Sequence, residues 1–292
     1  MTLTKILSGK DVCKSVYTSL EERIKRLKAK RIVPGLAVIL VGEDPASQVY
    51  VRSKSRRFER LSLYSETFAM PGTTSEKEIL RKIRKLNMDD RFHGILVQLP
   101  LPKHINEDAV LREVSPLKDV DGFHPENIGR LAVGNPRFIP CTPKGIMRIL
   151  EFYDIDLSGK HVVIIGRSNI VGRPLSLLTS QKKPLSNATT TICHSKTPDI
   201  RYFTKQADVV IAAIGVTQFV DETYIKPGAI LIDVGINQIP DDSEKKYRLV
   251  GDVHYDRING IASAVTPVPG GVGPMTIAML VENTVESAEA RL

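Results

Sequence analysis

Short runs of β-branched and aliphatic residues alternate with longer segments of helical periodicity along this chain. That alternation is typical of a parallel α/β sheet, because parallel strands need a crossover helix between them. The first half predicts helices over Lys10–Ala29, Ala46–Leu61, Ser75–Leu86 and Glu107–Val114, with strands over Leu36–Val41, Glu66–Ala69 and Gly94–Gln98. The second half predicts a helix over Pro143–Tyr153, a last helix after Pro274, and strands over Val162–Ile165, Thr189–Cys193, Val209–Ala212 and Ile230–Val234.

A loop-rich stretch near Pro116–Pro140 separates the two halves. The chain has 292 residues, which is long enough for two hydrophobic cores. We therefore expect an α/β protein with two α/β domains and a cleft between them. One domain is predicted to hold residues 1–140 and 274–292, and the other to hold residues 141–273. The second domain is predicted to be a Rossmann-type doubly wound parallel sheet.

The net charge of +8 raises the question of nucleic-acid binding. Basic residues cluster over Arg23–Arg31, Arg52–Arg60 and Arg81–Lys85, but apolar residues interrupt each cluster at helical spacing. Such segments are typical of the solvated faces of amphipathic helices. The chain has no Trp and only 5% aromatic residues, which leaves few platforms for stacking bases. We expect no nucleic-acid partner, although a basic surface also attracts small polyanions.

The three cysteines, Cys13, Cys141 and Cys193, are odd in number and far apart. They suit neither a disulfide framework nor metal-ligand spacing, so free thiols in a reducing compartment are the favoured interpretation. The histidines form no His-Glu-x-x-His motif, and no metal site is predicted. No apolar stretch approaches the roughly 20 residues that cross a membrane. The first residues lack a signal-peptide pattern, so a cytoplasmic protein without a membrane partner is expected.

Two polar residues one helical turn apart, Tyr50 and Lys54, follow the turn-forming pair Asp44-Pro45. Residues four apart lie over one another on a helix, so these side chains share a face. Gln98 follows the apolar run Gly94-Ile95-Leu96-Val97. A buried amide there must find a partner or cost about 1–3 kcal/mol. The helix that carries Tyr50 and Lys54 is a candidate for that partner, and the three residues together outline an active site.

Each of these residues also has an ordinary interpretation. Lysine is usually a solvated surface residue, and a strand glutamine can be satisfied by backbone groups alone. Asp121 lies in Lys118-Asp119-Val120-Asp121-Gly122, and an Asp-Gly pair is usually just a turn. Taken one at a time, the residues leave these alternatives open.

A second candidate site begins where the apolar strand His161–Ile165 ends at Gly166 and leads into a Leu-rich helix. At such a junction the backbone N–H groups and the helix dipole favour a phosphate. The motif departs from Gly-x-Gly-x-x-Gly because Ser168 stands at the second glycine position. The alternative is a purely structural turn, but the strand–turn–helix context favours a dinucleotide site.

The end of the next strand favours NADP over NAD. Enzymes that prefer NAD usually place Asp or Glu there for the ribose 2′-hydroxyl. Here Thr189–Cys193 is followed by His194-Ser195-Lys196-Thr197, which holds no acid. Arg167, Ser195 and Lys196 suit a 2′-phosphate, since Arg and Lys offer charged donors.

Further glycines mark other places for a ligand. Gly215 and the pair Gly235-Ile236 follow predicted strands, and open sheets of this kind bind ligands at such ends. The segment Pro267-Val268-Pro269-Gly270-Gly271-Val272-Gly273-Pro274 has too many glycines for a simple helix start. Its glycines permit close backbone approach or a positive φ, and Pro274 suits a first helical position.

Together these segments resemble the bifunctional methylenetetrahydrofolate dehydrogenase/methenyltetrahydrofolate cyclohydrolase family (the FolD type), over essentially the whole chain. Several long, independent matches in the same order argue against chance. The most specific pieces are Pro45–Val51 with Lys54, Gln98–Pro102, Lys118–Gly122, Gly166–Gly172, Cys193–Thr197 and Pro267–Thr276.

The resemblance implies a folate site in the cleft, with Lys54 as the principal catalytic group and Tyr50 and Gln98 assisting it. It implies that Asp121 grips the pterin ring and that 5,10-methylenetetrahydrofolate gives up hydride to NADP⁺. Water then converts the methenyl cation to 10-formyltetrahydrofolate. The substrate site is expected to hold Tyr50, Lys54, Gln98, Asp121, Pro269, Gly270 and Gly271. Cofactor contacts are expected from Gly166, Arg167, Ser168, Ser195, Ile236, Gly215 and Thr276.

The same resemblance implies a homodimer and a place in one-carbon metabolism, which serves purine biosynthesis. The family includes NAD-using members, so Arg167 and Ser195 favour NADP without proving it. No role is assigned to the loop Ser180–Asn187. One rival is an NADP-dependent dehydrogenase for another small acid, which explains the glycine turn but not the group around Lys54. Another is a family member that has lost one activity, and the intact Lys54 argues against loss of hydrolysis.

Overall fold

The structure is a computed structural model that describes residues 3–242 and 246–292. The chain divides into two compact α/β units. The three-stranded unit comprises Val16–Cys141 and Ile277–Leu292, and the six-stranded unit comprises Thr142–Thr276 with the residues up to Ser15. The N-terminal residues up to Ser15 belong to the six-stranded unit because β1 (Lys5–Ile6) pairs in parallel with β11 (Ala264–Val265). Helices α1 (Gly9–Ala29) and α10 (Val272–Glu289) both continue through the division.

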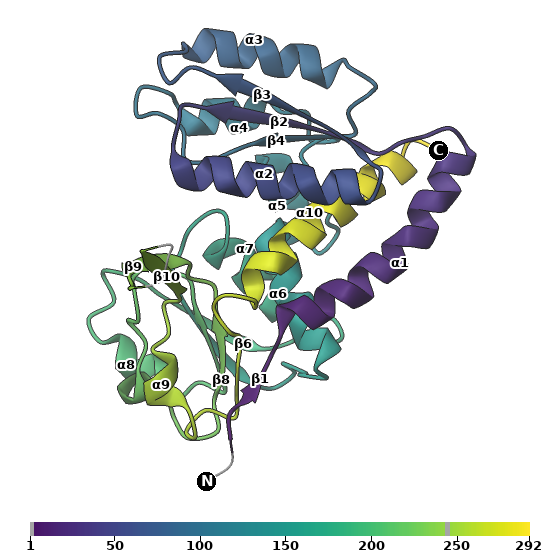
Figure 1. Ribbon diagram of the computed structural model, residues 1–292. Helices are drawn as coiled ribbons and strands as arrows, with labels where there is room; N and C mark the ends of the chain where they lie inside the picture. The colour runs from purple at the N-terminus through teal and green to yellow at the C-terminus, as the bar shows by residue number, and fades with distance from the viewer. Residues whose placement is uncertain (1–2, 243–245) are drawn as a thin grey trace. The chain divides into compact units, whose positions relative to one another are not determined.

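The three-stranded unit is built on a parallel sheet with the order β3-β2-β4. Its strands are β2 (Gly35–Val41), β3 (Tyr64–Met70) and β4 (Gly94–Val97). Every residue of β2 is buried, as expected for a central strand with both faces covered. Helices α2 (Pro45–Arg60) and α3 (Glu76–Asn87) lie on opposite faces of this sheet (Figure 1).

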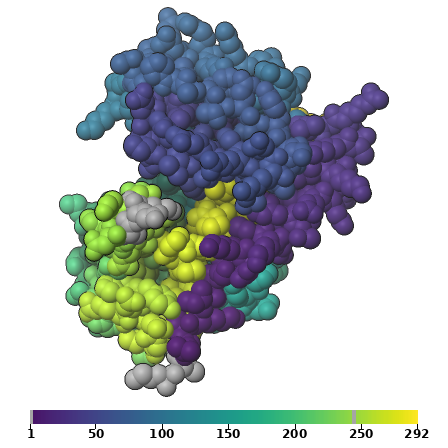
Figure 2. Space-filling view, viewed as in Figure 1, coloured from purple at the N-terminus to yellow at the C-terminus, as the bar shows by residue number. Residues whose placement is uncertain are grey.

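Helix α3 shows why these residues fold as they do. Ile79, Ile83 and Leu86 are buried at helical spacing and pack against a cluster that includes residues of β2 and β4. The side of α3 that faces away from the sheet forms part of the outer surface of this unit (Figure 2). The unit also holds α4 (Glu107–Glu113) and α5 (Pro125–Ala132).

Helix α5 corrects the expectation of an irregular chain between residues 116 and 140. Pro125 stands at its first position, and the His124 side chain accepts a hydrogen bond from the Glu126 N–H at 3.1 Å. The helix buries Asn127 and Leu131. Its eight residues include Gly129, a poor helix former, so local propensity hides it.

The six-stranded unit holds a parallel sheet with the order β1-β11-β8-β7-β5-β6. Its remaining strands are β5 (His161–Ile165), β6 (Thr189–Cys193), β7 (Val209–Ala212) and β8 (Ile230–Asp233). The chain passes from β5 outward to β6 and then returns to β7 on the other side of β5. This reversal is the switch point of a doubly wound sheet, which confirms the Rossmann-type expectation.

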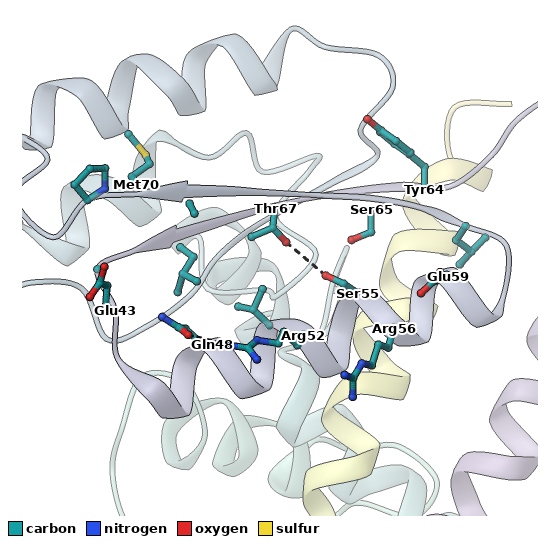
Figure 3. A pocket seen from close by; sticks show the side chains of 16 residues that line it. Glu43, Gln48, Arg52, Ser55, Arg56, Glu59, Tyr64, Ser65, Thr67 and Met70 are labelled. Atoms are coloured by element: carbon teal, nitrogen blue, oxygen red, sulfur yellow. Dashed lines mark hydrogen bonds between the residues drawn. The ribbon is translucent and has the colours of Figure 1, made fainter.

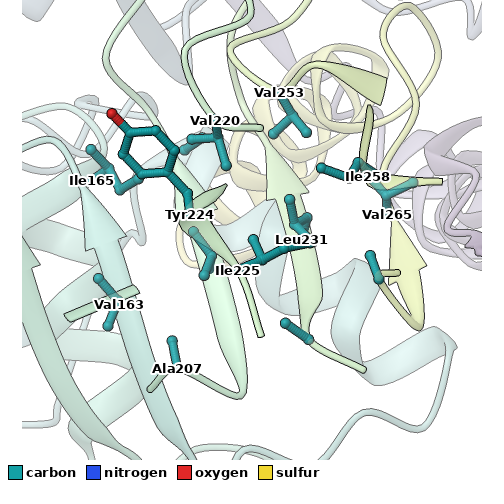
Figure 4. Packing of buried hydrophobic residues seen from close by; sticks show 14 of the residues in the cluster. Val163, Ile165, Ala207, Val220, Tyr224, Ile225, Leu231, Val253, Ile258 and Val265 are labelled. Carbon is teal, nitrogen blue, oxygen red and sulfur yellow. The ribbon is translucent and has the colours of Figure 1, made fainter. Parts of the chain in front are cut away.

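One face of the six-stranded sheet carries a large apolar cluster. Ile165, Leu231 and Val265 project from three strands toward Tyr224 and Ile258 (Figure 4). The helices of this unit are α6 (Cys141–Phe152), α7 (Gly172–Ser180), α8 (Ile200–Thr204), α9 (Tyr255–Ile258) and a 3-10 turn over Glu222–Tyr224. An antiparallel pair, β9 (Asn237–Pro240) and β10 (Tyr247–Val250), follows β8.

Helix α10 begins at Val272, inside the glycine-rich segment and two residues before Pro274. Pro274 is therefore in the first turn rather than at the first position, where its missing N–H still costs no helical hydrogen bond. Within the described residues, no helix combines the length and the apolar character needed to cross a membrane.

Candidate functional site

Helix α2 buries a lysine in its apolar stripe. Asp44 caps the helix by accepting a hydrogen bond from the Ser47 N–H at 2.8 Å, and Pro45 occupies its first turn. Val51, Lys54 and Phe58 then fall at buried positions three and four residues apart. Lys54 is only 4% exposed, so the fold places an amine where a core residue is expected.

Lys54 meets Gln98 directly after β4. The Lys54 Nζ donates a hydrogen bond to Gln98 Oε1 at 3.0 Å, and Gln98 Nε2 donates to the Leu99 carbonyl at 2.6 Å. The ammonium also lies 4.6 Å from the centroid of the Tyr50 ring, within range of a cation–π interaction. The structure thus brings together the three residues that spacing grouped in the sequence.

Burial and charge act in opposite directions on this amine. Desolvation lowers the pKa of Lys54 from its ordinary value, while the nearby Asp121 carboxylate and Cys141 sulfur raise it. The loss of solvation has the larger effect. For Asp121, burial raises the pKa, and Lys54 and a hydrogen bond with Cys141 oppose that rise. Lys54, Asp121 and Cys141 therefore form one electrostatic group.

The turn that carries Asp121 is held by a second carboxylate. Asp119 is buried and accepts hydrogen bonds from the N–H groups of Phe123 at 3.2 Å and His124 at 2.8 Å. It also accepts from Asn127 Nδ2 at 2.8 Å, and burial raises its pKa to about 7. Neither Asp119 nor Cys141 is among the site residues predicted from the sequence. The only available signal for Asp119 was a second acid two residues before Asp121.

The glycine turn after β5 is tight. Gly166 has a φ of +123°, and a Cβ there would collide with the Ala213 carbonyl. Gly172 packs equally closely on the Gly166 carbonyl. Ser168 Oγ accepts hydrogen bonds from the N–H groups of Val171 at 3.2 Å and Gly172 at 3.5 Å. The serine at the second glycine position therefore holds the backbone N–H groups where α7 begins.

The ends of β5 and β6 carry the predicted cofactor residues. Arg167 is exposed after β5, and Ser195 and Lys196 are exposed after the neighbouring β6. Two cationic side chains, a hydroxyl and no acid at the β6 end fit the charge of a 2′-phosphate. The tight glycine turn between β5 and α7 fits the approach of a pyrophosphate. This edge of the sheet therefore has charged donors that suit the 2′-phosphate of NADP.

The other predicted residues also belong mostly to the six-stranded unit. Gly215 has a φ of +66° after β7, and Ile236 is 54% exposed after β8. Thr276 Oγ1 lies 2.9 Å from Thr142 Oγ1. Gly270 has a φ of +110°. Gly270, Pro269 and Gly271 lie in the six-stranded unit, whereas Lys54 lies in the three-stranded one, so their place in the substrate site stays a prediction.

The other side of α2 lines a separate groove of about 890 Å³. Figure 3 shows Arg52, Ser55 and Glu59 of α2 along it, with Thr67 of β3 opposite. The hydroxyls of Ser55 and Thr67 lie 3.5 Å apart across it. Lys54 does not line this groove. Helix α2 thus separates the buried amine from an open groove whose lining is partly polar and mostly apolar.

The sequence matches a known family in two consecutive segments. Residues 7–121 match the family described as "Tetrahydrofolate dehydrogenase/cyclohydrolase, catalytic domain". Residues 140–292 match "Tetrahydrofolate dehydrogenase/cyclohydrolase, NAD(P)-binding domain". These two matches leave little of the chain uncovered.

Relatives that match over nearly the whole chain are named as FolD proteins. A protein named "Bifunctional protein FolD" from Chlorobium chlorochromatii (strain CaD3) is 53% identical over 286 residues, which cover 97% of both chains. The crystal structure of the bifunctional enzyme FolD from Campylobacter jejuni superposes with a TM-score of 0.92 at 47% identity, covering 99% of this chain and all of that one. The structure of the Trypanosoma brucei FolD, solved with NADP cofactor and an inhibitor, superposes with a TM-score of 0.93 at 36% identity. The superposition covers 100% of this chain and 99% of that one.

Proposed function

The chain belongs to the tetrahydrofolate dehydrogenase/cyclohydrolase family, and from that premise we propose that it is a bifunctional enzyme of one-carbon metabolism. It oxidises 5,10-methylenetetrahydrofolate to 5,10-methenyltetrahydrofolate with NADP⁺. It then hydrolyses the methenyl compound to 10-formyltetrahydrofolate. The buried Lys54, hydrogen-bonded to Gln98 beside Tyr50 and Asp121, is the observation that carries the proposal.

Lys54 supplies the proton transfer that hydrolysis needs. Because burial lowers its pKa, more neutral amine is present near neutral pH than at an exposed lysine. The neutral amine takes a proton from the water that attacks the methenyl carbon, and the resulting ammonium gives a proton to the departing ring nitrogen. The second proton of that water passes to solvent as the formyl carbonyl forms. A cationic substrate lowers the pKa of Lys54 further. Gln98 Oε1 fixes the direction of the Lys54 amine through their hydrogen bond.

Tyr50 and Asp121 complete the substrate site. The Tyr50 ring lies against one side of the Lys54 amine and stabilises the ammonium form that proton transfer produces. Asp121 offers carboxylate oxygens to the donor edge of a pterin ring, where paired hydrogen bonds add orientation as well as affinity. Pro269, Gly270 and Gly271 are proposed as further substrate contacts.

The six-stranded unit would bind NADP in this proposal, and the cofactor would supply the hydride acceptor. The tight turn at Gly166 lets the backbone approach the pyrophosphate. Arg167 and Ser195 hold the 2′-phosphate. Further contacts are assigned to Ser168, Gly215, Ile236 and Thr276. The proposed functional division assigns residues 1–140 and 274–292 to folate and residues 141–273 to NADP, although the residues up to Ser15 fold with the six-stranded unit.

We include a homodimer and a cytoplasmic location in the proposal. Among the described residues, β3 pairs only with β2, so its other edge offers unpaired backbone groups. In a two-fold symmetric dimer, the β3 edges of the two copies would pair with each other, which would satisfy the backbone groups of both. The double substitution Thr67→Lys and Ala69→Lys places charges on exposed positions of this strand. It should convert a dimer to a monomer in light scattering, and an unchanged mass would exclude this edge as the interface.

The direct test is an assay of the purified protein on 5,10-methylenetetrahydrofolate, with NADP⁺ and NAD⁺ in parallel. We expect cofactor reduction with little lasting methenyl product, and faster reduction with NADP⁺. Arg167→Ala with Ser195→Ala should raise the KM for NADP⁺ at least tenfold and leave the KM for NAD⁺ nearly unchanged, because only NADP⁺ carries the 2′-phosphate. No reduction of either cofactor by folded protein would contradict the dehydrogenase assignment.

A further inference from the structure

Two buried carboxylates that the proposed function does not use lie at the carboxyl-terminal edge of the six-stranded sheet. Asp233 is the last residue of β8, and Asp252 follows β10. Asp233 is 4% exposed and Asp252 is fully buried. Burial of a carboxylate costs free energy unless hydrogen-bond donors surround it, so the donors around each one show which segments it connects.

Asp252 joins two segments that follow different strands. Its Oδ2 accepts hydrogen bonds from the N–H groups of Ile214 at 2.8 Å and Gly215 at 2.9 Å, just after β7. Its Oδ1 accepts from Asn237 Nδ2 at 3.0 Å, at the start of β9. One carboxylate therefore links the chain after β7 to the segment that leaves β8.

Asp233 in turn fixes the backbone of Asp252. Its Oδ1 accepts from the N–H groups of Asp252 at 2.8 Å and Gly235 at 3.1 Å, and its Oδ2 accepts from the Val253 N–H at 3.0 Å. A Cβ at Gly235 would collide with the Asp252 carboxylate, and one at Gly251 with the Asp233 carboxylate. These two glycines are needed because the carboxylates pack against the backbone.

The position of this network relates it to one half of the cofactor. In a doubly wound sheet the pyrophosphate lies at the turn after the first strand, here β5, and the adenosine ribose at the end of the next, here β6. The nicotinamide half must then extend to the other side of β5, over the ends of β7 and β8. Gly215 and the exposed Ile236 lie at those two ends.

We propose that Asp252 is a positioning residue for the nicotinamide half of NADP, because it holds the segments after β7 and β8 in one arrangement before the cofactor binds. This inference rests on the proposed dehydrogenase function. Without Asp252, binding must also order the two segments, and that cost appears as weaker affinity for the half that lies on them. The adenosine half, at the ends of β5 and β6, is not affected.

The test is Asp252→Asn, with Asp208→Asn as the matched control. Asp208 also accepts a backbone hydrogen bond, from the His161 N–H at 2.8 Å, and bonds to Lys226 Nζ at 2.7 Å. It precedes β7 and meets the first residue of β5, so it serves the opposite, amino-terminal edge of the same sheet. Each variant is titrated with NADPH and with 2′,5′-ADP, which contains only the adenosine half.

For Asp252→Asn we expect NADPH to bind at least tenfold more weakly and 2′,5′-ADP to bind within twofold of the wild type. Dehydrogenase kcat/KM should fall by a similar or larger factor, while hydrolysis of added methenyltetrahydrofolate stays within twofold. Asp208→Asn should leave all four quantities nearly unchanged. Asn237→Ala removes only the hydrogen bond between Asp252 and β9, so it should weaken NADPH binding a few-fold. This variant replaces Asp252→Asn as the test if Asp252→Asn does not fold.

Wild-type affinity for NADPH in both Asp252→Asn and Asn237→Ala would overturn the inference. Equal weakening of NADPH and 2′,5′-ADP would also overturn it, because that result indicates general loosening of the unit. Failure of the proposed function would look different. In that case the wild-type protein itself would neither bind NADPH nor reduce NADP⁺.

Discussion

Two buried lysines of the three-stranded unit, Lys54 and Lys118, have the same chemistry and nearly the same burial. They are 4% and 5% exposed, and desolvation lowers the pKa of both. Lys118 Nζ donates to the carbonyls of Leu86 at 2.9 Å and Asp89 at 2.8 Å, where α3 ends. Lys54 Nζ donates to the Gln98 side chain, next to Tyr50.

The difference between their partners separates a structural lysine from a catalytic one. Carbonyls at a helix C-terminus are fixed acceptors that favour a positive charge, so Lys118 is best suited to remain an ammonium and close the end of α3. The Gln98 side chain can accept from an ammonium or from a neutral amine, so Lys54 can change its protonation state without leaving backbone groups unpaired. Burial of a lysine is therefore weak evidence of catalysis until its partners are known.

The largest effect should come from Lys54→Met. A positioned proton-transfer group contributes about 10²- to 10⁴-fold to rate, so hydrolysis of methenyltetrahydrofolate should fall at least 100-fold. Stability should be unchanged or higher, because a buried ammonium is replaced by an apolar chain of similar length. The loss of methenyl absorbance measures the rate, and urea unfolding measures the stability. Normal hydrolysis in this variant would remove Lys54 from the mechanism.

The second effect concerns His93, whose titration Lys118 influences. The His93 Nδ1 accepts a hydrogen bond from the Gly35 N–H at 3.1 Å, and burial lowers the pKa of His93 to about 4. Its ordinary value is 6.5, so folding favours the neutral ring. The resulting stability is complete above pH 6.5 and is lost as the pH falls toward 4, by up to about 3 kcal/mol.

His93→Gln keeps an acceptor for the Gly35 N–H but cannot titrate. Urea unfolding of both proteins between pH 7 and pH 4 separates this contribution from that of other groups. The unfolding free energy of the wild type should fall relative to that of the variant as the solution becomes more acidic. Parallel pH profiles would show that His93 does not contribute.

The third and smallest change of the set is Lys118→Met. It leaves the carbonyls of Leu86 and Asp89 without their ammonium donor, so the unit should lose about 2 kcal/mol of stability. The rate of hydrolysis per folded molecule should stay within twofold of the wild type. If hydrolysis instead falls as far as in Lys54→Met, the distinction between the two lysines is wrong.

The sequence alone predicted the central strands and the long helices within about two residues, because their apolar periodicity is local. It missed β1 and β11, which have two residues each and exist only as a pair of segments far apart in the chain. It also missed α5, whose Gly129 and flanking turn residues mask a short amphipathic helix.

The site divides in the same way. Tyr50, Lys54 and Gln98 were predictable because four-residue spacing and a polar residue after an apolar strand are visible locally. Cys141 was interpreted only as a free thiol, and its hydrogen bond to Asp121 depends on tertiary contacts. The link between Asp233 and Asp252 was likewise invisible, since nothing in the periodicity relates the end of β8 to the residues after β10.

The pH dependence of methenyltetrahydrofolate hydrolysis, compared between the wild type and Gln98→Glu, tests the role of Lys54 most directly. The substitution places a carboxylate beside the Lys54 amine, which favours the ammonium and raises the pKa of Lys54. We predict that hydrolysis requires the neutral amine, so the hydrolysis rate rises with pH as Lys54 loses its proton. In the variant this rise in rate should move to higher pH by about one unit or more. A rise in the hydrolysis rate over the same pH range in both proteins would contradict the proposal that Lys54 is the proton-transfer group.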